Sequence, residues 1–419
     1  MERYNEYKDS GVQWLGEIPS HWTIMPLKYS GRFCKGKLPS NTNDNCLGKP
    51  IIGASEMNGN MPSVYSEDNS VPQCTQNDIL FLWDGANAGL VSSFHDGIVA
   101  STVTKFTCDN SNIVSTYLYY LEKNYQRYYK ERVGGTTIPH MNSQYIASCP
   151  LLIPSIQEQQ AIADYLDTAT TKIDEAIAQQ QKMIDLLNER KQIIINNAVT
   201  KGLNPDAPMK DSGVDWIGEI PEHWEALRIR YIGEAKNGLT YSPNDMVDEG
   251  NGILVLRSSN IQDGKLAFED NVYVKGAPEK LWVKKGDIII CSRNGSASLV
   301  GKCAIVEEDI YASFGAFMMR FRSEHNSKYT YYLLTAAISH YKQLFATSTI
   351  NQLTLGIFAD IKMPFVYDLQ EQTKIAESLD LAIKKLDTAI SNATKQISLL
   401  QERKQIIIND VVTGKVKVL

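Results

Sequence analysis

The chain contains a long internal repeat, which constrains its fold more than any other feature of the sequence. KDSGVQWLGEIPSHW at 8–22 returns as KDSGVDWIGEIPEHW at 210–224, and LLNERKQIIINNAVT at 186–200 returns as LLQERKQIIINDVVT at 399–413. Each pair is identical at twelve of fifteen positions, whereas the stretches between these blocks differ. A duplicated frame around two different inserts predicts two similar structural units with different surfaces.

Each repeat ends in a segment whose apolar residues are spaced alternately by four and three positions. This spacing is typical of helices that pair in a coiled coil. Pro154 and Pro364 precede the two segments, and Gly202 and Gly414 follow them, as expected for helix boundaries. The spacing alone allows the two helices to pair parallel or antiparallel. The predicted seam consists of Ile162, Leu166, Ile173, Met183, Leu187 and Ile194 in the first helix and of Ile375, Leu379, Leu386, Leu400 and Ile407 in the second.

The inserts have the pattern of mixed α/β domains. Short runs of branched and aromatic residues at 78–83, 252–256 and 287–290 predict buried strands. Tyr-rich segments at 116–129 and 329–345 predict one helix in each insert. The sequence therefore predicts an α+β protein in which two long helices separate two mixed α/β domains. The predicted segments are 1–24, 25–154, 155–201, 202–224, 225–367, 368–413 and 414–419.

The net charge of −6 is unevenly distributed along the chain. Residues 25–150 contain ten Lys and Arg against ten Asp and Glu, and residues 225–362 contain sixteen against fifteen. The acidic excess therefore lies in the repeated frame. Overall acidity argues against nonspecific coating of DNA, but each insert retains enough basic residues for a local DNA-binding face.

Cysteine usage and hydropathy indicate the cellular compartment. The seven cysteines form no Cys-x-x-Cys pair, which favours reduced thiols over disulfides or a zinc site. No apolar run approaches the ~20 residues that a membrane-spanning helix needs. We therefore expect a cytoplasmic protein with no membrane segment and no bound metal.

Motifs for catalysis are absent from the sequence. It contains no Gly-x-x-x-x-Gly-Lys-Ser/Thr phosphate-binding loop and no Asn/Asp-Pro-Pro-aromatic motif of adenine methylation. Asp78 and Asp287 each begin a predicted strand, and a structural turn explains them better than a metal site. The repeated Trp22 and Trp224 are expected to brace each insert against the end of a helix. The sequence predicts no catalytic residue.

Two pairs of loops are candidates for DNA contact. Residues 83–87 align with 292–296, and residues 134–142 align with 346–352. Arg contacts to guanine and Asn contacts to adenine suit the first pair, and hydroxyl groups suit phosphate contacts in the second. The alternative is that these loops only close each domain. The predicted contacts are Asp84, Asn87, Thr136, Thr137, His140 and Asn142 in the first insert and Arg257, Ser258, Asn260, Arg293, Asn294, Ser296, Lys302, Thr349, Asn351 and Gln352 in the second.

The repeated motifs resemble the specificity subunits of type I restriction-modification systems. The resemblance rests on the KDSG-V-x-W block, on IPSIQEQQAIADYLD at 153–167 with its variant VYDLQEQTKIAESLD at 366–380, and on the ERKQIII block. It implies two target-recognition domains and two long helices that form an antiparallel coiled coil with pseudo-two-fold symmetry. Residues that read bases differ between members of this family, so the resemblance does not identify them.

The resemblance also implies a function and partners. Such a chain is a non-catalytic subunit that binds a bipartite, asymmetric site in double-stranded DNA and docks two methyltransferase (M) subunits and restriction (R) subunits. It binds no cofactor itself, because S-adenosylmethionine, ATP and Mg²⁺ belong to the partner subunits. The alternatives are a bifunctional DNA-modifying enzyme and a coiled-coil scaffold without a role in DNA binding.

Overall fold

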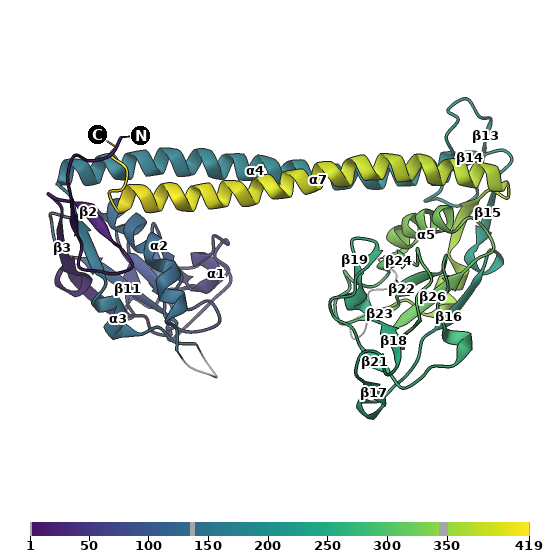
Figure 1. The fold of residues 1–419 in the computed structure, drawn as a ribbon, viewed down its shortest axis with the longest axis horizontal. Helices are drawn as coiled ribbons and strands as arrows, with labels where there is room; N and C mark the ends of the chain where they lie inside the picture. The colour runs from purple at the N-terminus through teal and green to yellow at the C-terminus, as the bar shows by residue number, and fades with distance from the viewer. Residues whose placement is uncertain (1, 135–138, 343–350, 419) are drawn as a thin grey trace. The chain divides into compact units, whose positions relative to one another are not determined.

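The computed structural model describes residues 2–134, 139–342 and 351–418. The chain divides into two compact units, of which unit 1 comprises 1–181 and 394–419 and unit 2 comprises 182–393. The two long helices are α4 (Ile156–Lys201) and α7 (Leu369–Val412) (Figure 1). The boundaries between the units fall within these helices, so each unit contains one insert and part of both helices. The sequence predicted the helices as segments separate from the inserts.

Unit 1 contains two four-stranded sheets. One sheet has the order β4-β11-β8-β9 with antiparallel neighbours, and the other has the order β6-β5-β10-β7, in which β10 runs parallel to β5. The other elements of unit 1 are α1 (Ala54–Met57), α2 (Ser115–Glu131) and α3 (Ser143–Ala147), with strands β1 (Tyr7–Asp9), β2 (Glu17–Pro19), β3 (Thr23–Pro26), β4 (Gly31–Lys35), β5 (Lys49–Ile52), β6 (Tyr65–Ser66), β7 (Gln73–Cys74), β8 (Ile79–Leu82), β9 (Val91–Ser92), β10 (Gly97–Val99), β11 (Val103–Cys108) and β12 (Pro150–Ile153).

Unit 2 repeats this architecture. Its sheets have the orders β16-β26-β22-β24 and β17-β21-β18-β25, with β25 parallel to β18. Its other elements are α5 (Ser327–Tyr341) and α6 (Leu355–Asp360), with strands β13 (Met209–Asp211), β14 (Glu219–Pro221), β15 (Glu225–Arg228), β16 (Glu234–Asn237), β17 (Met246–Val247), β18 (Ile253–Leu256), β19 (Ile261–Gln262), β20 (Lys265–Leu266), β21 (Tyr273–Val274), β22 (Ile288–Cys291), β23 (Arg293–Asn294), β24 (Cys303–Ile305), β25 (Ala312–Phe314), β26 (Met318–Arg322), β27 (Asn351–Gln352) and β28 (Lys362–Phe365). The predicted strands β8, β18 and β22 are confirmed, and all three are buried along their whole length.

The repeated KDSG block forms the same hairpin in each unit. Lys8 pairs with Ile18 across β1 and β2, and Lys210 pairs with Ile220 across β13 and β14. His-Trp follows each hairpin and holds the first turn of a long helix.

In unit 1 this contact is made to α4. The Trp22 indole N–H donates to Oε1 of Glu158 (3.1 Å), and the other carboxylate oxygen lies 3.1 Å from His21 Nε2. In unit 2, Trp224 donates to Glu371 at the start of α7 (3.0 Å). A carboxylate is favourable at this place because the N-terminal turn of a helix carries partial positive charge. Both tryptophans are fully buried, so their predicted bracing role is confirmed.

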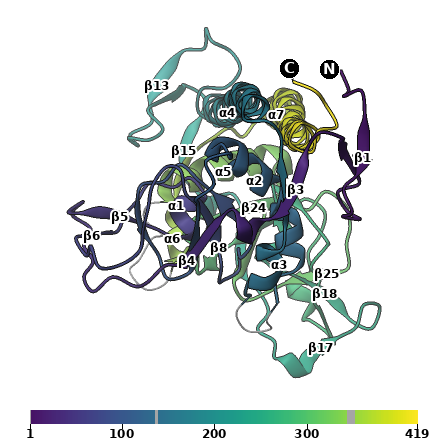
Figure 2. The same cartoon turned by 90° about the vertical axis from the view of Figure 1, so that its left-hand side faces the viewer.

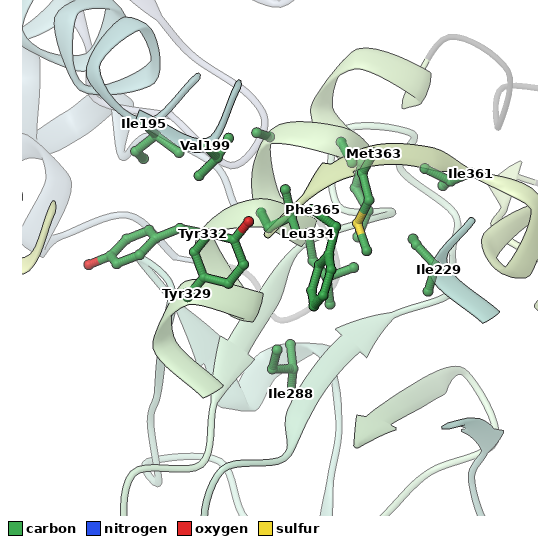
Figure 3. Close-up of a cluster of buried hydrophobic side chains, with 14 of the residues drawn as sticks. Ile195, Val199, Ile229, Ile288, Tyr329, Tyr332, Leu334, Ile361, Met363 and Phe365 are labelled. Carbon is green, nitrogen blue, oxygen red and sulfur yellow. The ribbon is translucent and has the colours of Figure 1, made fainter. Parts of the chain in front are cut away.

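The ends of the long helices belong to the cores of the two units. Ile162 and Leu166 of α4 lie in the core of unit 1 together with Val411 of α7. In unit 2 the two helices exchange these places, since the core contains Ile195 of α4 (Figure 3) together with Ile375 of α7. These helices therefore bury apolar area against the inserts as well as along the seam.

The predicted seam is less uniform than its spacing indicates. Ile162, Leu166, Ile173, Ile375 and Leu379 are buried. Leu187, Ile194, Leu386, Leu400 and Ile407 are half-buried. Met183 is 51 % exposed, so its assignment to a buried seam is wrong. The equivalent position in α7 is polar Gln396, which fits an exposed site.

The remaining features concern cysteines, membranes and metals. All seven cysteines are free thiols. Across the described ranges, no helix is long and apolar enough to cross a membrane. Within the same ranges, no group of three or more His, Cys, Asp and Glu side chains gathers as a metal site would require. Asp78 and Asp287 instead close the turns before their strands by accepting the backbone N–H of Thr75 and Lys284.

Candidate nucleic-acid interface

In unit 2 the two predicted DNA-contacting loops pair with each other. Arg293 lies opposite Gln352, and Asn294 lies opposite Asn351, in an antiparallel ladder of β23 and β27. The Leu353 N–H extends this pairing by donating to the Ser292 carbonyl (2.7 Å). We call residues 292–294 with 351–353 the paired-loop platform of unit 2.

Arg293 is held on this platform by an aromatic ring. Its guanidinium carbon lies 5.2 Å from the ring centroid of Phe317, and its backbone N–H donates to the Phe317 carbonyl (3.1 Å). The Phe317 ring is 59 % exposed. No ion pair among the described residues involves Arg293. The planar guanidinium therefore keeps its donors available for a planar acceptor outside the protein.

Unit 1 builds the same backbone arrangement from different residues. Asp84 forms a β-bridge with His140, and the Met141 N–H donates to the Trp83 carbonyl (3.0 Å). A further bond joins the Gly85 N–H to the Pro139 carbonyl (3.0 Å). Residues 83–85 with 139–141 form the paired-loop platform of unit 1. The position of Arg293 in unit 2 is therefore occupied by Asp84 in unit 1.

The side chains of the unit 1 platform form a closed network. Lys35 Nζ donates to Asp84 Oδ2 (2.5 Å), and His140 Nδ1 hydrogen-bonds the other carboxylate oxygen. The Trp83 indole N–H donates to His140 Nε2 (3.2 Å). Because an indole N–H only donates, Nε2 must accept and the ring proton resides on Nδ1. His140, predicted as a DNA contact, therefore has two side-chain partners within the platform, Asp84 and Trp83.

This network also sets the charge of the carboxyl group. Burial by itself raises the pKa of Asp84, but hydrogen bonds from Lys35 and His140 outweigh that effect and lower the pKa below its ordinary value. Asp84 is therefore ionised at neutral pH. It presents hydrogen-bond acceptors where Arg293 presents donors.

Other predicted residues lie on or next to the platforms. Asn294 donates to Ser258 Oγ (3.3 Å) and accepts from the Ser296 N–H (3.0 Å). Asn87 is exposed after the unit 1 platform, and Asn142 caps α3 by accepting from the Tyr145 N–H (3.0 Å). Their contact with DNA stays a prediction.

Asn260 requires correction. Asn260 is fully buried, and its amide donates to the Ala267 carbonyl (3.0 Å) while accepting from the Arg257 N–H (2.9 Å). Such a side chain shapes its own loop and does not reach a base. The guanidinium of Arg257 lies 2.8 Å from the Asp270 carboxylate, and its contact with DNA stays a prediction.

The Lys302 carbonyl accepts from the N–H of Cys291 (2.8 Å), the residue before the platform, and contact of Lys302 with DNA stays a prediction. Lys302 lines a cavity of about 1040 Å³ in unit 2 together with residues of β20, α5 and both long helices. Thr136, Thr137 and Thr349 lie outside the described residues.

Sequence reasoning missed an exposed stripe on each long helix. On α4 the stripe consists of Leu186, Glu189, Arg190 and Ile193, and on α7 it consists of Leu399, Glu402, Arg403 and Ile406. The four apolar members are 51–55 % exposed. The two stripes are identical although their side chains face solvent, so burial does not explain the identity. The sequence alone could have revealed these stripes, because their residues are identical in the two repeats although they lie outside the predicted seam.

Comparison with known proteins agrees with the repeat. The family model described as type I restriction modification DNA specificity domain matches residues 19–184 and 221–398. The type I restriction enzyme MjaVIII specificity subunit of Methanocaldococcus jannaschii is 27% identical, over 100% of this chain and 98% of its own length. The EcoBI specificity subunit of Escherichia coli is 22% identical, over 95% of this chain and 87% of its own length.

A solved structure has the same fold. It is described as the structural basis of complex assembly and conformational transition of the type I R-M system. It superposes with a TM-score of 0.71 at 14% identity and covers 95% of this chain and 99% of the other. Since the family model matches both repeats, the chain belongs to the family of type I restriction modification DNA specificity proteins.

Proposed function

We propose that this chain is the non-catalytic DNA-recognition subunit of a type I restriction-modification complex. Each unit would read one half of a bipartite, asymmetric site in double-stranded DNA. The observation that carries the proposal is the paired-loop platform, which has the same backbone pairing in both units but different side chains. Two readers with one scaffold and different contacts suit a site with two different halves.

The chemistry of the complex is assigned to partner chains. S-adenosylmethionine would bind to the methyltransferase subunits, and ATP with Mg²⁺ would bind to the restriction subunits. The sequence supports this division, because it has neither an adenine methylation motif nor a phosphate-binding loop. The DNA substrate would place the complex in the cytoplasm.

We propose that α4 and α7 pair as an antiparallel coiled coil with pseudo-two-fold symmetry. In unit 1, Lys404 of α7 donates to Asp174 of α4 (2.6 Å), and in unit 2, Lys191 of α4 donates to Asp387 of α7 (2.7 Å). Asp387 is the repeat equivalent of Asp174, and Lys404 is the equivalent of Lys191. The two ion pairs are thus the same contact made twice with the helices exchanged, which supports the symmetry. The length of the paired helices would then set the unread spacer of the DNA site.

The identical exposed stripes on α4 and α7 are proposed as docking sites for two methyltransferase subunits. Leu186 and Ile193 lie one heptad apart on one face of α4, with Glu189 and Arg190 between them. Leu399 and Ile406 repeat this pattern on α7. Exposed apolar residues at helical spacing suit a partner helix. Two identical stripes suit two copies of one partner, to which restriction subunits would add.

Methylation mapping in cells tests the proposed function. The chain and its methyltransferase partner would be expressed together, and methylated adenines would be mapped by single-molecule sequencing. We expect methylation confined to one split sequence, and none when the chain is omitted. Methylation without sequence preference would exclude the proposal, and methylation by this chain alone would identify a bifunctional enzyme. An assembled complex without sequence-selective binding would leave only a scaffold role.

A further inference from the structure

The two paired-loop platforms have the same backbone and opposite hydrogen-bonding character. The first residue of each ladder is Arg293 in unit 2 and Asp84 in unit 1. We infer that this position determines base specificity in each unit, and that Arg293 reads guanine in the half-site of unit 2. The inference rests on the proposed function and adds to it the base chemistry of each half-site.

Arg293 has the geometry of a guanine reader. Guanine presents two acceptors, O6 and N7, at its major-groove edge, and the planar fork of Arg matches both. The Phe317 ring, 5.2 Å from the guanidinium carbon, supports one face of the group. The backbone of Arg293 is fixed from two sides, by the ladder to Gln352 and by its hydrogen bond to the Phe317 carbonyl. A supported, planar donor loses less conformational freedom on binding than a free side chain.

The neighbouring amides are occupied within the platform. The Asn351 side chain donates to the Gly295 carbonyl (3.2 Å), and the Asn294 side chain donates to Ser258 Oγ (3.3 Å). Both asparagine amides thus have a partner inside the protein, whereas among the described residues the Arg293 guanidinium has no ion pair and Gln352 is exposed. Of the Arg and Asn side chains that the sequence suggested as base contacts in this loop, the structure therefore favours Arg293.

Asp84 gives unit 1 the opposite preference. Its carboxylate would repel O6 and N7 of guanine, which carry partial negative charge. It suits instead the amino group of cytosine or adenine, which donates in the major groove. Lys35 and His140 each hold one carboxylate oxygen, so the acceptor has a fixed direction. The half-sites are therefore expected to differ at the matching position, as an asymmetric target requires.

Replacement of Arg293 tests the inference in the assembled complex. The Arg293→Ala chain would be expressed with the methyltransferase partner, and methylated adenines would be mapped as for the unchanged chain. We expect a guanine at one position of one half-site to lose its preference over other bases by about 5- to 150-fold. The other half-site should keep its sequence. Arg228→Ala, which removes an exposed arginine of unit 2 outside the platform, should leave the whole motif unchanged.

The possible outcomes separate a base contact from a phosphate contact. If Arg293 binds phosphate, Arg293→Ala lowers methylation evenly and keeps the motif, which overturns the inference. An unchanged motif with unchanged methylation overturns it as well. Arg293→Lys keeps the positive charge but loses the planar guanidinium. A relaxed preference for guanine without loss of DNA affinity in this variant supports the inference. This result can be obtained even where the alanine variant assembles poorly. If the unchanged complex already lacks a split motif, the proposed function itself has failed.

Discussion

Glu122 lies fully buried on α2, in the core of unit 1. Its Oε2 accepts a hydrogen bond from the Tyr129 hydroxyl (2.5 Å), whereas its Oε1 has no hydrogen-bond partner among the residues that the structure describes. Burial raises the pKa of Glu122 to about 7, although the Tyr129 hydrogen bond partly opposes this rise. The carboxyl group is therefore protonated in the folded unit under mildly acidic conditions. In the unfolded chain it ionises near its ordinary value of 4.5.

This difference predicts a pH-dependent stability of unit 1. The neutral acid stabilises the fold fully below pH 4.5, and that contribution is lost as the pH rises to about 7. Glu122→Gln stays neutral at all pH values and can still accept from Tyr129. We expect it to raise the free energy of unfolding by at most about 3 kcal/mol at pH 8 and to leave it unchanged at pH 4.5. Urea unfolding at both pH values measures the difference.

The control for Glu122→Gln lies on the same helix. Glu131 is exposed at the end of α2, so Glu131→Gln should leave the pH profile as it is. A Glu122→Gln profile that follows the unchanged chain at every pH would contradict the prediction.

Gly414 and Gly11 share a left-handed backbone with φ of +72° but differ in their surroundings. A Cβ at Gly414 would lie 2.4 Å from Pro19 Cδ and 3.0 Å from the Trp22 ring, whereas one at Gly11 would meet no atom of the described ranges within 4 Å. Gly11→Ala should therefore cost only backbone strain, about 1–2 kcal/mol. Gly414→Ala adds a clash and should cost about 1–3 kcal/mol more. Thermal unfolding of the two variants compares these costs, and equal losses would be inconsistent with the close packing at Pro19.

At the scale of elements, the sequence predicted the helices and strands that a local pattern of apolar residues determines. The long helices follow from an unbroken spacing of apolar residues, and β8, β18 and β22 follow from short branched runs between turn residues. Alignment of the inserts identified both loops of each paired-loop platform, although the pairing itself was not predicted.

The predictions that were wrong depend on tertiary contacts, which the spacing of residues along the sequence does not reveal. Asn260 resembles an exposed loop amide, but carbonyl groups seven and ten residues later, at Ala267 and Asp270, enclose it. Met183 has the right spacing for the seam, yet this part of α4 lies outside the cores in which the helix ends are buried.

A length change in the helices tests their role as spacers. One extra heptad between Asp174 and Lys191 lengthens α4 by about 10.5 Å, close to three base pairs of about 3.4 Å each. A matching heptad between Asp387 and Lys404 keeps both ion pairs. We expect the doubly extended chain to recognise the same half-sites with about three more unread base pairs, as methylation mapping would reveal. The heptad in α4 alone serves as the control, because it breaks the pairing register and should abolish directed methylation. An unchanged number of unread base pairs between the half-sites of the doubly extended chain would refute the spacer role.

At the scale of the whole chain, the two termini meet within unit 1. The Lys417 N–H donates to the Glu2 carbonyl (2.9 Å), and the Tyr7 hydroxyl donates to the Gly414 carbonyl (3.1 Å). The views of the fold likewise place the two chain ends next to each other (Figures 1 and 2). In unit 2 the equivalent segments are joined covalently, since residues 202–208 lead from α4 to β13. The contact between Lys417 and Glu2 in unit 1 therefore stands where residues 202–208 form the covalent connection in unit 2.

A circular permutant tests this description. In the permutant, a short Gly-Ser linker joins residue 419 to residue 1, and the chain is opened between Asn204 and Ala207. The chain break then lies in unit 2, and the covalent connection lies in unit 1. Residues 204–207 lie in an exposed turn, where a break removes few contacts. We expect the permutant to fold and to direct methylation to the unchanged motif. An insoluble permutant, or one with a new motif, would show that the covalent order of the units matters.

The His-Trp contact with the first turn of each long helix has a consequence for how such a chain acquires new targets. The contact uses Glu158 in unit 1 and Glu371 in unit 2, and the blocks that supply it are nearly identical. A genetic crossover within these blocks replaces one insert or duplicates the other while it preserves the residues that attach any insert to the frame. New DNA specificities can therefore arise by recombination of whole inserts, without selection for a new helix pair.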